Sequence, residues 1–131
     1  MAIKRLDHVS VVVDDLAGAI AFFTVLGMTI EGEMPARALG VDRVNGLESV
    51  QVDIVMMRTP DRHGRLELTK SRNLKLVEIE PAIAPPNTLG LRSVMFTVES
   101  VDAPQSHVTR NHPAFSPTCA AILLGALRRS P

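Results

Sequence analysis

The sequence predicts an α+β fold in which a β-α-β-β-β module is followed by an incomplete second module. A valine-rich, strand-like segment at residues 6–13 runs directly into a helical segment, and two further strand-like segments end near residue 71. An altered copy of the first segment appears at residues 91–101. Such an internal repeat indicates two copies of one structural module.

The composition fits one globular domain over residues 1–131, because hydrophobic residues make up 46% of the chain and charged residues 21%. The 14 basic and 14 acidic side chains balance and aromatic residues are only 3%, so we expect no nucleic-acid partner. A single cysteine, Cys119, favours the reducing cytoplasm. We expect no membrane segment or signal peptide, since no apolar run approaches the roughly 20 residues that cross a bilayer.

The first predicted strand, residues 6–13, presents two different faces because strand side chains alternate. One face holds Val9, Val11 and Val13, and the other holds His8, Ser10 and Val12. We expect the following helix to cover the valine face, which leaves His8 on the opposite face.

A helix is predicted after this strand, with Asp14 or Asp15 as its N-terminal cap. Its apolar residues recur close to helical spacing, at Leu16, Ile20, Phe23 and Leu26. Gly27 is a natural position for the helix to end. Residues 28–31 then begin the second strand.

Two more strands complete the first module, which we place at residues 1–71. We expect residues 35–48 to be irregular, because they contain Pro35, Gly40 and Gly46. Residues 50–56 alternate as a half-buried strand does, and a turn at residues 60–64 leads to a returning strand. In that last strand Leu66 and Leu68 share one face, and Glu67 lies on the other.

Residues 72–90 are predicted to connect the modules, and residues 91–131 to form a partial second module. Its first strand begins at Leu91, but Pro104, Pro113 and Pro117 interrupt the region where a helix should follow. We expect residues 118–129 to form a short helix, and no strand after it.

Four segments, at residues 6–15, 22–28, 64–68 and 89–98, together resemble the vicinal oxygen chelate superfamily. This superfamily includes glyoxalase I, methylmalonyl-CoA epimerase, extradiol dioxygenases and bleomycin-resistance proteins. The resemblance covers about residues 3–103 and implies a glyoxalase/bleomycin resistance/dioxygenase-like fold. In that fold two β-α-β-β-β modules pair, and their curved sheets enclose a metal site.

By this resemblance, His8 and Glu67 match the two metal-ligand positions of the first module. An imidazole and a carboxylate suit a divalent ion such as Mn²⁺, Fe²⁺, Zn²⁺ or Ni²⁺. The resemblance implies a lyase, isomerase or dioxygenase in which the ion acts as a Lewis acid on a small oxygen-rich substrate. Glu67 is also our candidate catalytic base, because a metal-ligand Glu serves as the base in glyoxalase-like members.

The second module departs from the family pattern. Ser93 stands where a histidine is often found, and no Asp or Glu follows Asp102. A homodimer could rebuild the site if each chain contributed His8 and Glu67 across a two-fold axis. Alternatively, the protein is a metal-free small-molecule binding protein of the bleomycin-resistance type, or an inactive relative whose tail was altered by a frameshift or truncation.

Overall fold

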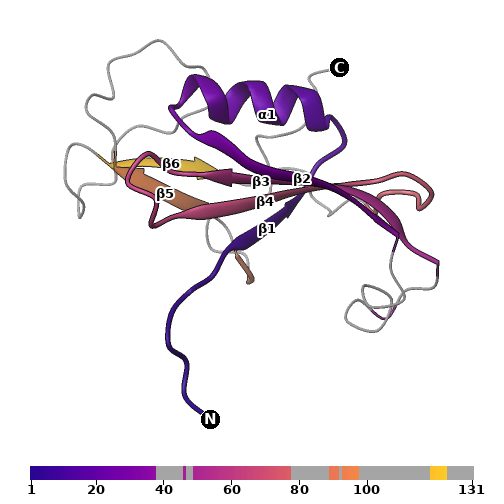
Figure 1. Ribbon diagram of the computed structural model, residues 1–131, viewed down its shortest axis with the longest axis horizontal. Helices are drawn as coiled ribbons and strands as arrows, with labels where there is room; N and C mark the ends of the chain where they lie inside the picture. The colour runs from indigo at the N-terminus through magenta and orange to yellow at the C-terminus, as the bar shows by residue number, and fades with distance from the viewer. Residues whose placement is uncertain (38–45, 47–48, 78–88, 92, 98–118, 124–131) are drawn as a thin grey trace. The chain divides into compact units, whose positions relative to one another are not determined.

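The computed structural model describes residues 1–37, 46, 49–77, 89–91, 93–97 and 119–123 of the chain. In these residues the chain forms one helix and six strands (Figure 1). The chain divides into two compact units, Met1–Val77 and Glu78–Arg128, and each is described by itself. No helix of the described residues is both long and apolar enough to cross a membrane.

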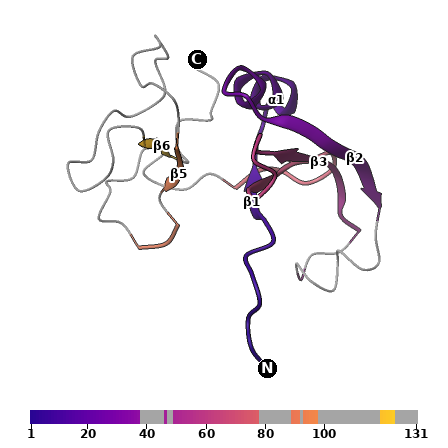
Figure 2. The ribbon, with the colours of Figure 1, turned by 60° about the vertical axis from the view of Figure 1, so that its left-hand side comes forward.

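The first unit is a four-stranded sheet with a helix on one face (Figures 1 and 2). Its elements are β1 (Val9–Val12), α1 (Leu16–Val25), β2 (Thr29–Arg37), β3 (Gln51–Arg58) and β4 (Arg65–Ser71). The strand order is β1-β4-β3-β2, with β1 parallel to β4 and the other pairs antiparallel. This arrangement confirms the predicted α+β fold and its β-α-β-β-β module.

The core of this unit lies between α1 and the sheet. The buried side chains include Val11, Val13, Ala19, Phe23, Val55, Met57, Leu66 and Leu68. Helix α1 contacts β4, whose two buried residues are Leu66 and Leu68. Each fully buried large side chain stabilises the fold by roughly 1.5–3 kcal/mol. The predicted valine face is therefore the face that α1 covers, and the opposite face remains open for polar side chains.

Both ends of α1 agree with the sequence prediction. Asp15 is the N-cap, and its Oδ1 accepts a hydrogen bond from the Gly18 amide at 3.0 Å. At the other end, Gly27 takes a left-handed φ of 94°, and the Met28 amide donates to the Phe23 carbonyl at 3.0 Å. This is a Schellman closure, which favours glycine because residues with a Cβ are strained at positive φ.

Two strand boundaries differ from the prediction. β1 begins at Val9 rather than at residue 6. Val9 pairs with Leu66, and β4 begins only one residue earlier, at Arg65, so residues 6 and 7 have no pairing partner in this strand. β2 continues through Pro35 to Arg37, in a region that was expected to be irregular. The proline is tolerated because β2 is at the edge of the sheet, where its missing N–H breaks no ladder.

β3 is buried in part on both faces. Val55 and Met57 belong to the face that α1 covers, whereas Val50 and Val52 form a separate cluster on the opposite face. Ile54 and Leu74 pack against this cluster. The open face of the sheet is therefore apolar at one end, which is why β3 does not show a simple polar–apolar alternation.

In the second unit, β5 (Ser93–Thr97) pairs antiparallel with β6 (Cys119–Leu123). The predicted first strand of the second module is present, but the helix expected at residues 118–129 is wrong for residues 119–123. Alanine and leucine favour helix, but intrinsic propensity is a weak determinant, and pairing with β5 overrides it. The three prolines and the rest of the expected helix lie outside the described residues.

Leu68→Ala should destabilise the protein by about 2–5 kcal/mol, because Leu68 is fully buried beneath α1 and its removal leaves a cavity. Urea unfolding followed by circular dichroism measures this change. Val77→Ala, at an exposed position of the same unit, is the control and should change stability by less than about 0.5 kcal/mol. Equal effects of the two substitutions would contradict the assignment of the core.

Candidate metal centre

His8 and Glu67 come together on the face of the sheet opposite α1. His8 is the last residue before β1, and Glu67 lies in the middle of β4, where it pairs with Ser10. The parallel pairing of these strands brings His8 Nε2 to 3.7 Å from Glu67 Oε2. Both side chains remain reachable from solvent, at 36% and 21% exposure. The two residues selected from the sequence are thus neighbours in space.

Two hydroxyl groups orient the Glu67 carboxylate. Ser10 Oγ donates a hydrogen bond to Glu67 Oε1 at 2.8 Å, and Thr69 Oγ1 donates to the same oxygen at 3.1 Å. Because both donors engage Oε1, Oε2 is the oxygen that faces His8. The sequence did not point to a role for either hydroxyl. Strand alternation does place Ser10 on the same face as His8, and Thr69 on the same face as Glu67.

The other imidazole nitrogen of His8 is occupied. His8 Nδ1 lies 2.9 Å from Asp7 Oδ2, and Asp7 Oδ1 forms ion pairs with Arg5 and Arg65. The hydrogen bond with His8 is the main reason that the pKa of Asp7 lies below its usual value, and the charges of Arg65 and Arg5 lower it further. Asp7 is therefore a carboxylate at neutral pH.

The space between His8 and Glu67 fits a divalent ion. The 3.7 Å separation of Nε2 and Oε2 is too long for a hydrogen bond. Two ligands that each lie about 2.1 Å from one ion can be up to about 4.2 Å apart, so an ion can bridge them. One nitrogen and one oxygen ligand suit Mn²⁺, Fe²⁺, Zn²⁺ or Ni²⁺.

Within the part of the chain that the structure describes, no group of three or more potential metal-ligating side chains is found. His63 lies in the turn before β4, where its amide donates to Asp61. Ser93 begins β5 in the second unit, and His107 and His112 lie outside the described residues. A catalytic metal usually has three protein ligands, so further ligands must come from elsewhere.

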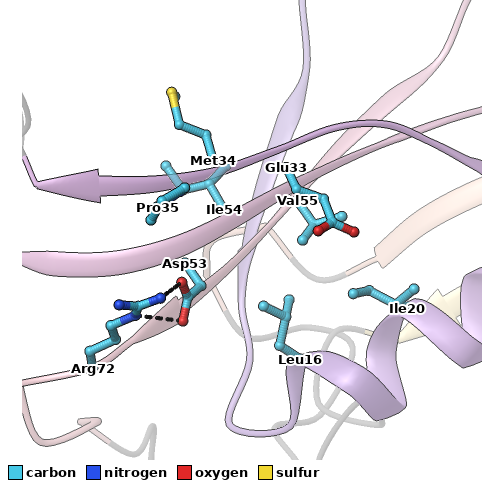
Figure 3. A pocket seen from close by; sticks show the side chains of 9 residues that line it. All are labelled: Leu16, Ile20, Glu33, Met34, Pro35, Asp53, Ile54, Val55 and Arg72. Carbon is cyan, nitrogen blue, oxygen red and sulfur yellow. Dashed lines mark hydrogen bonds and ion pairs between the residues drawn. The ribbon is translucent and has the colours of Figure 1, made fainter.

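A second feature of the first unit is a hollow of about 320 Å³ (Figure 3). Its lining residues are Leu16, Ile20, Glu33, Met34, Pro35, Asp53, Ile54, Val55 and Arg72. Arg72 Nε donates to Asp53 Oδ2 at 2.8 Å, and this hydrogen bond is the main reason for the lowered pKa of Asp53. The Asp53–Arg72 pair neutralises its own charges, and the lining also contains the carboxylate of Glu33.

Comparisons with known proteins agree with this architecture. A family model described as the Glyoxalase/Bleomycin resistance protein/Dioxygenase superfamily matches residues 5–116. The crystal structure of a glyoxalase family protein from Bacillus cereus is similar, with 38% sequence identity and a TM-score of 0.64. That match covers 70% of this chain and 60% of the Bacillus cereus chain. No curated protein matches the sequence.

Arg72→Gln should raise the pKa of Asp53 toward its usual value of about 3.9, because the pairing that favours the carboxylate is lost. In the native protein this pairing stabilises the fold above about pH 4, and the contribution is lost as the pH falls through the lowered pKa. Carboxyl carbon chemical shifts followed by NMR during a pH titration measure the effect. Asp61, whose pKa is lowered by Thr59 and His63, is the internal control and should not change.

Proposed function

The chain belongs to the Glyoxalase/Bleomycin resistance protein/Dioxygenase superfamily, and from this premise we propose that it is a metal-dependent enzyme that acts on a small oxygen-rich molecule. The reaction would be that of a lyase, an isomerase or a dioxygenase. His8 and Glu67 would hold a divalent ion of the Mn²⁺, Fe²⁺, Zn²⁺ or Ni²⁺ type. The single cysteine supports a cytoplasmic location as part of this proposal.

One observation supports the proposal above all others: the free atoms of the two side chains face each other. His8 Nδ1 is taken by Asp7 and Glu67 Oε1 by Ser10 and Thr69, so Nε2 and Oε2 remain across a 3.7 Å gap. This separation is longer than a hydrogen bond of about 2.7–3.2 Å, and the two groups form an ion pair only when His8 is protonated. A gap that an ion can fill is the arrangement expected of two metal ligands.

Each side chain has a defined task in this proposal. When bound, a divalent ion supplies Lewis-acid stabilisation to negative charge that develops on substrate oxygens. Glu67 is also the candidate base, which would accept a proton from a substrate carbon next to a carbonyl group, while Ser10 and Thr69 hold its Oε1 in place. The neutral His8 ring would present Nε2 as an acceptor to the same space.

A second copy of the chain would complete the ligand set. Two-fold pairing of the open sheet faces would bring together two His8 and two Glu67 side chains. The same face exposes apolar side chains, with Val12 at 65% and Met34 at 59% exposure. Burying such side chains favours association. We therefore propose a homodimer that shares one ion.

A second candidate function is metal-free binding of a small molecule, as in bleomycin-resistance proteins. Among the described residues, no more than two potential metal ligands lie together, whereas a catalytic site usually has three. In addition, Ser93 occupies the position where a second-module histidine is often found. These observations favour the binding protein, whereas the proximity of His8 and Glu67 favours the enzyme. The two functions differ in whether the purified protein holds a metal that depends on His8.

Metal content of protein purified without chelator tests the proposal. We expect about one divalent ion per two chains in the wild type, because the proposed ligand set spans a dimer. His8→Ala and Glu67→Gln should each retain less than about a tenth of this metal, since each removes half of the proposed protein ligands. Elemental analysis by mass spectrometry gives the ratio.

His63→Ala is the matched control, because it removes a histidine of the turn before β4 and should leave the metal content unchanged. Sedimentation velocity on the same samples tests the dimer. Equal metal in the wild type and His8→Ala contradicts the site, and a monomer with full metal contradicts the two-fold completion. If the wild-type protein is purified without metal and does not bind added ions, the result favours metal-free binding of a small molecule.

A further inference from the structure

Asp7 dictates which nitrogen of His8 carries the proton. His8 Nδ1 lies 2.9 Å from Asp7 Oδ2. A carboxylate can only accept hydrogen bonds, so Nδ1 must be the donor in this contact. In a neutral imidazole the other nitrogen is then an acceptor. In that neutral form Nε2, which lies 3.7 Å from Glu67 Oε2, is the nitrogen without a proton.

Asp7 and His8 reach each other because they precede β1 and lie outside the sheet. Within a strand, neighbouring side chains point to opposite faces and cannot form such a pair. The start of β1 at Val9, which is set by its pairing with Leu66, is thus a condition for this contact.

Arg65 holds Asp7 in place from the first position of β4. Its guanidinium forms an ion pair with Asp7 Oδ1, and its Nε donates to the Asp7 backbone carbonyl at 3.3 Å. Arg5 also contacts Oδ1, at 3.1 Å, but from an exposed position in the N-terminal segment. With Oδ1 engaged by the arginines, Oδ2 is the oxygen that remains for His8.

Arg65 is in turn held by Glu31. Arg65 and Arg58 face each other across β4 and β3, and like charges in that arrangement repel. Glu31, at the irregularity in the pairing of β2 with β3, forms ion pairs with both arginines. Positive and negative groups therefore alternate across the open face, from Arg58 to Asp7.

We propose that Asp7 is a positioning residue that fixes the tautomer and orientation of the His8 ring, and that Arg65 fixes Asp7. The inference rests on the proposed function for its purpose, because a ligating histidine needs an unprotonated nitrogen toward the ion. Partners of this kind typically change metal affinity by about 10–100-fold when they are removed. The tautomer itself is measurable without any metal.

The first test is the tautomer of His8 in metal-free protein, read from long-range ¹H–¹⁵N correlation spectra at about pH 8, where an ordinary imidazole is neutral. His8→Ala assigns the signal among the four histidines. We expect the Nδ1–H form to be the major one, because a hydrogen bond to a carboxylate favours it. Asp7→Asn should remove this preference, since an amide offers both a donor and an acceptor.

Arg65→Gln should shift the tautomer in the same direction, because it frees the Asp7 carboxylate to turn. The matched control is Asp53→Asn, which removes another arginine-paired carboxylate on the face that α1 covers. It should leave the His8 spectrum unchanged. An unchanged tautomer in Asp7→Asn overturns the proposal for Asp7, and an unchanged tautomer in Arg65→Gln overturns the role of Arg65.

The second test is the affinity for added Mn²⁺ or Zn²⁺, measured by calorimetry. Asp7→Asn should bind about 10–100-fold more weakly than the wild type, and Asp53→Asn within about twofold of it. Loss of affinity with an unchanged tautomer shows a charge effect alone and overturns the positioning role. A wild type that binds no ion, but whose tautomer responds to Asp7→Asn, overturns the proposed function and upholds the inference.

Discussion

The parallel pairing of β1 with β4 places Val9 beside Leu66 and Ser10 beside Glu67. In this register Leu66 and Leu68 are buried beneath α1, and Glu67 is left on the open face. A slip of one residue would reverse both outcomes, because strand side chains alternate between faces. Burial of the two leucines stabilises this register, and the same register places Glu67 beside Ser10, near the start of β1. Core and candidate site depend on one register.

The polar groups around the site contribute orientation more than stability. Asp7, Arg5 and Arg65 are partly or largely exposed, and exposed ion pairs typically contribute little to stability. Such energies are small beside the roughly 1.5–3 kcal/mol of a buried apolar side chain. They can still bias the balance between rotamers or tautomers, because small free-energy differences already shift such populations. The main effect of these ion pairs is therefore to orient the His8 ring through Asp7.

Much of the first module could be predicted from the sequence, because alternation along a strand depends only on neighbouring residues. That rule placed His8 and Glu67 on the open face. It could not select Asp7, since a residue next to His8 is expected on the other face until the true start of β1 is known. The strand at residues 119–123 was missed because its two alanines and Leu123 favour helix, and its partner β5 is distant in sequence. Pro35 was misread because an edge position is not visible in the local sequence.

In the proposed function, one divalent ion binds between His8 and Glu67. A crystal structure of the protein saturated with Mn²⁺, with an anomalous difference map at a wavelength where manganese scatters, would locate this ion. We expect a peak within about 2.3 Å of both His8 Nε2 and Glu67 Oε2. A fully occupied manganese ion elsewhere, or no peak between these two atoms at saturating metal, would contradict it.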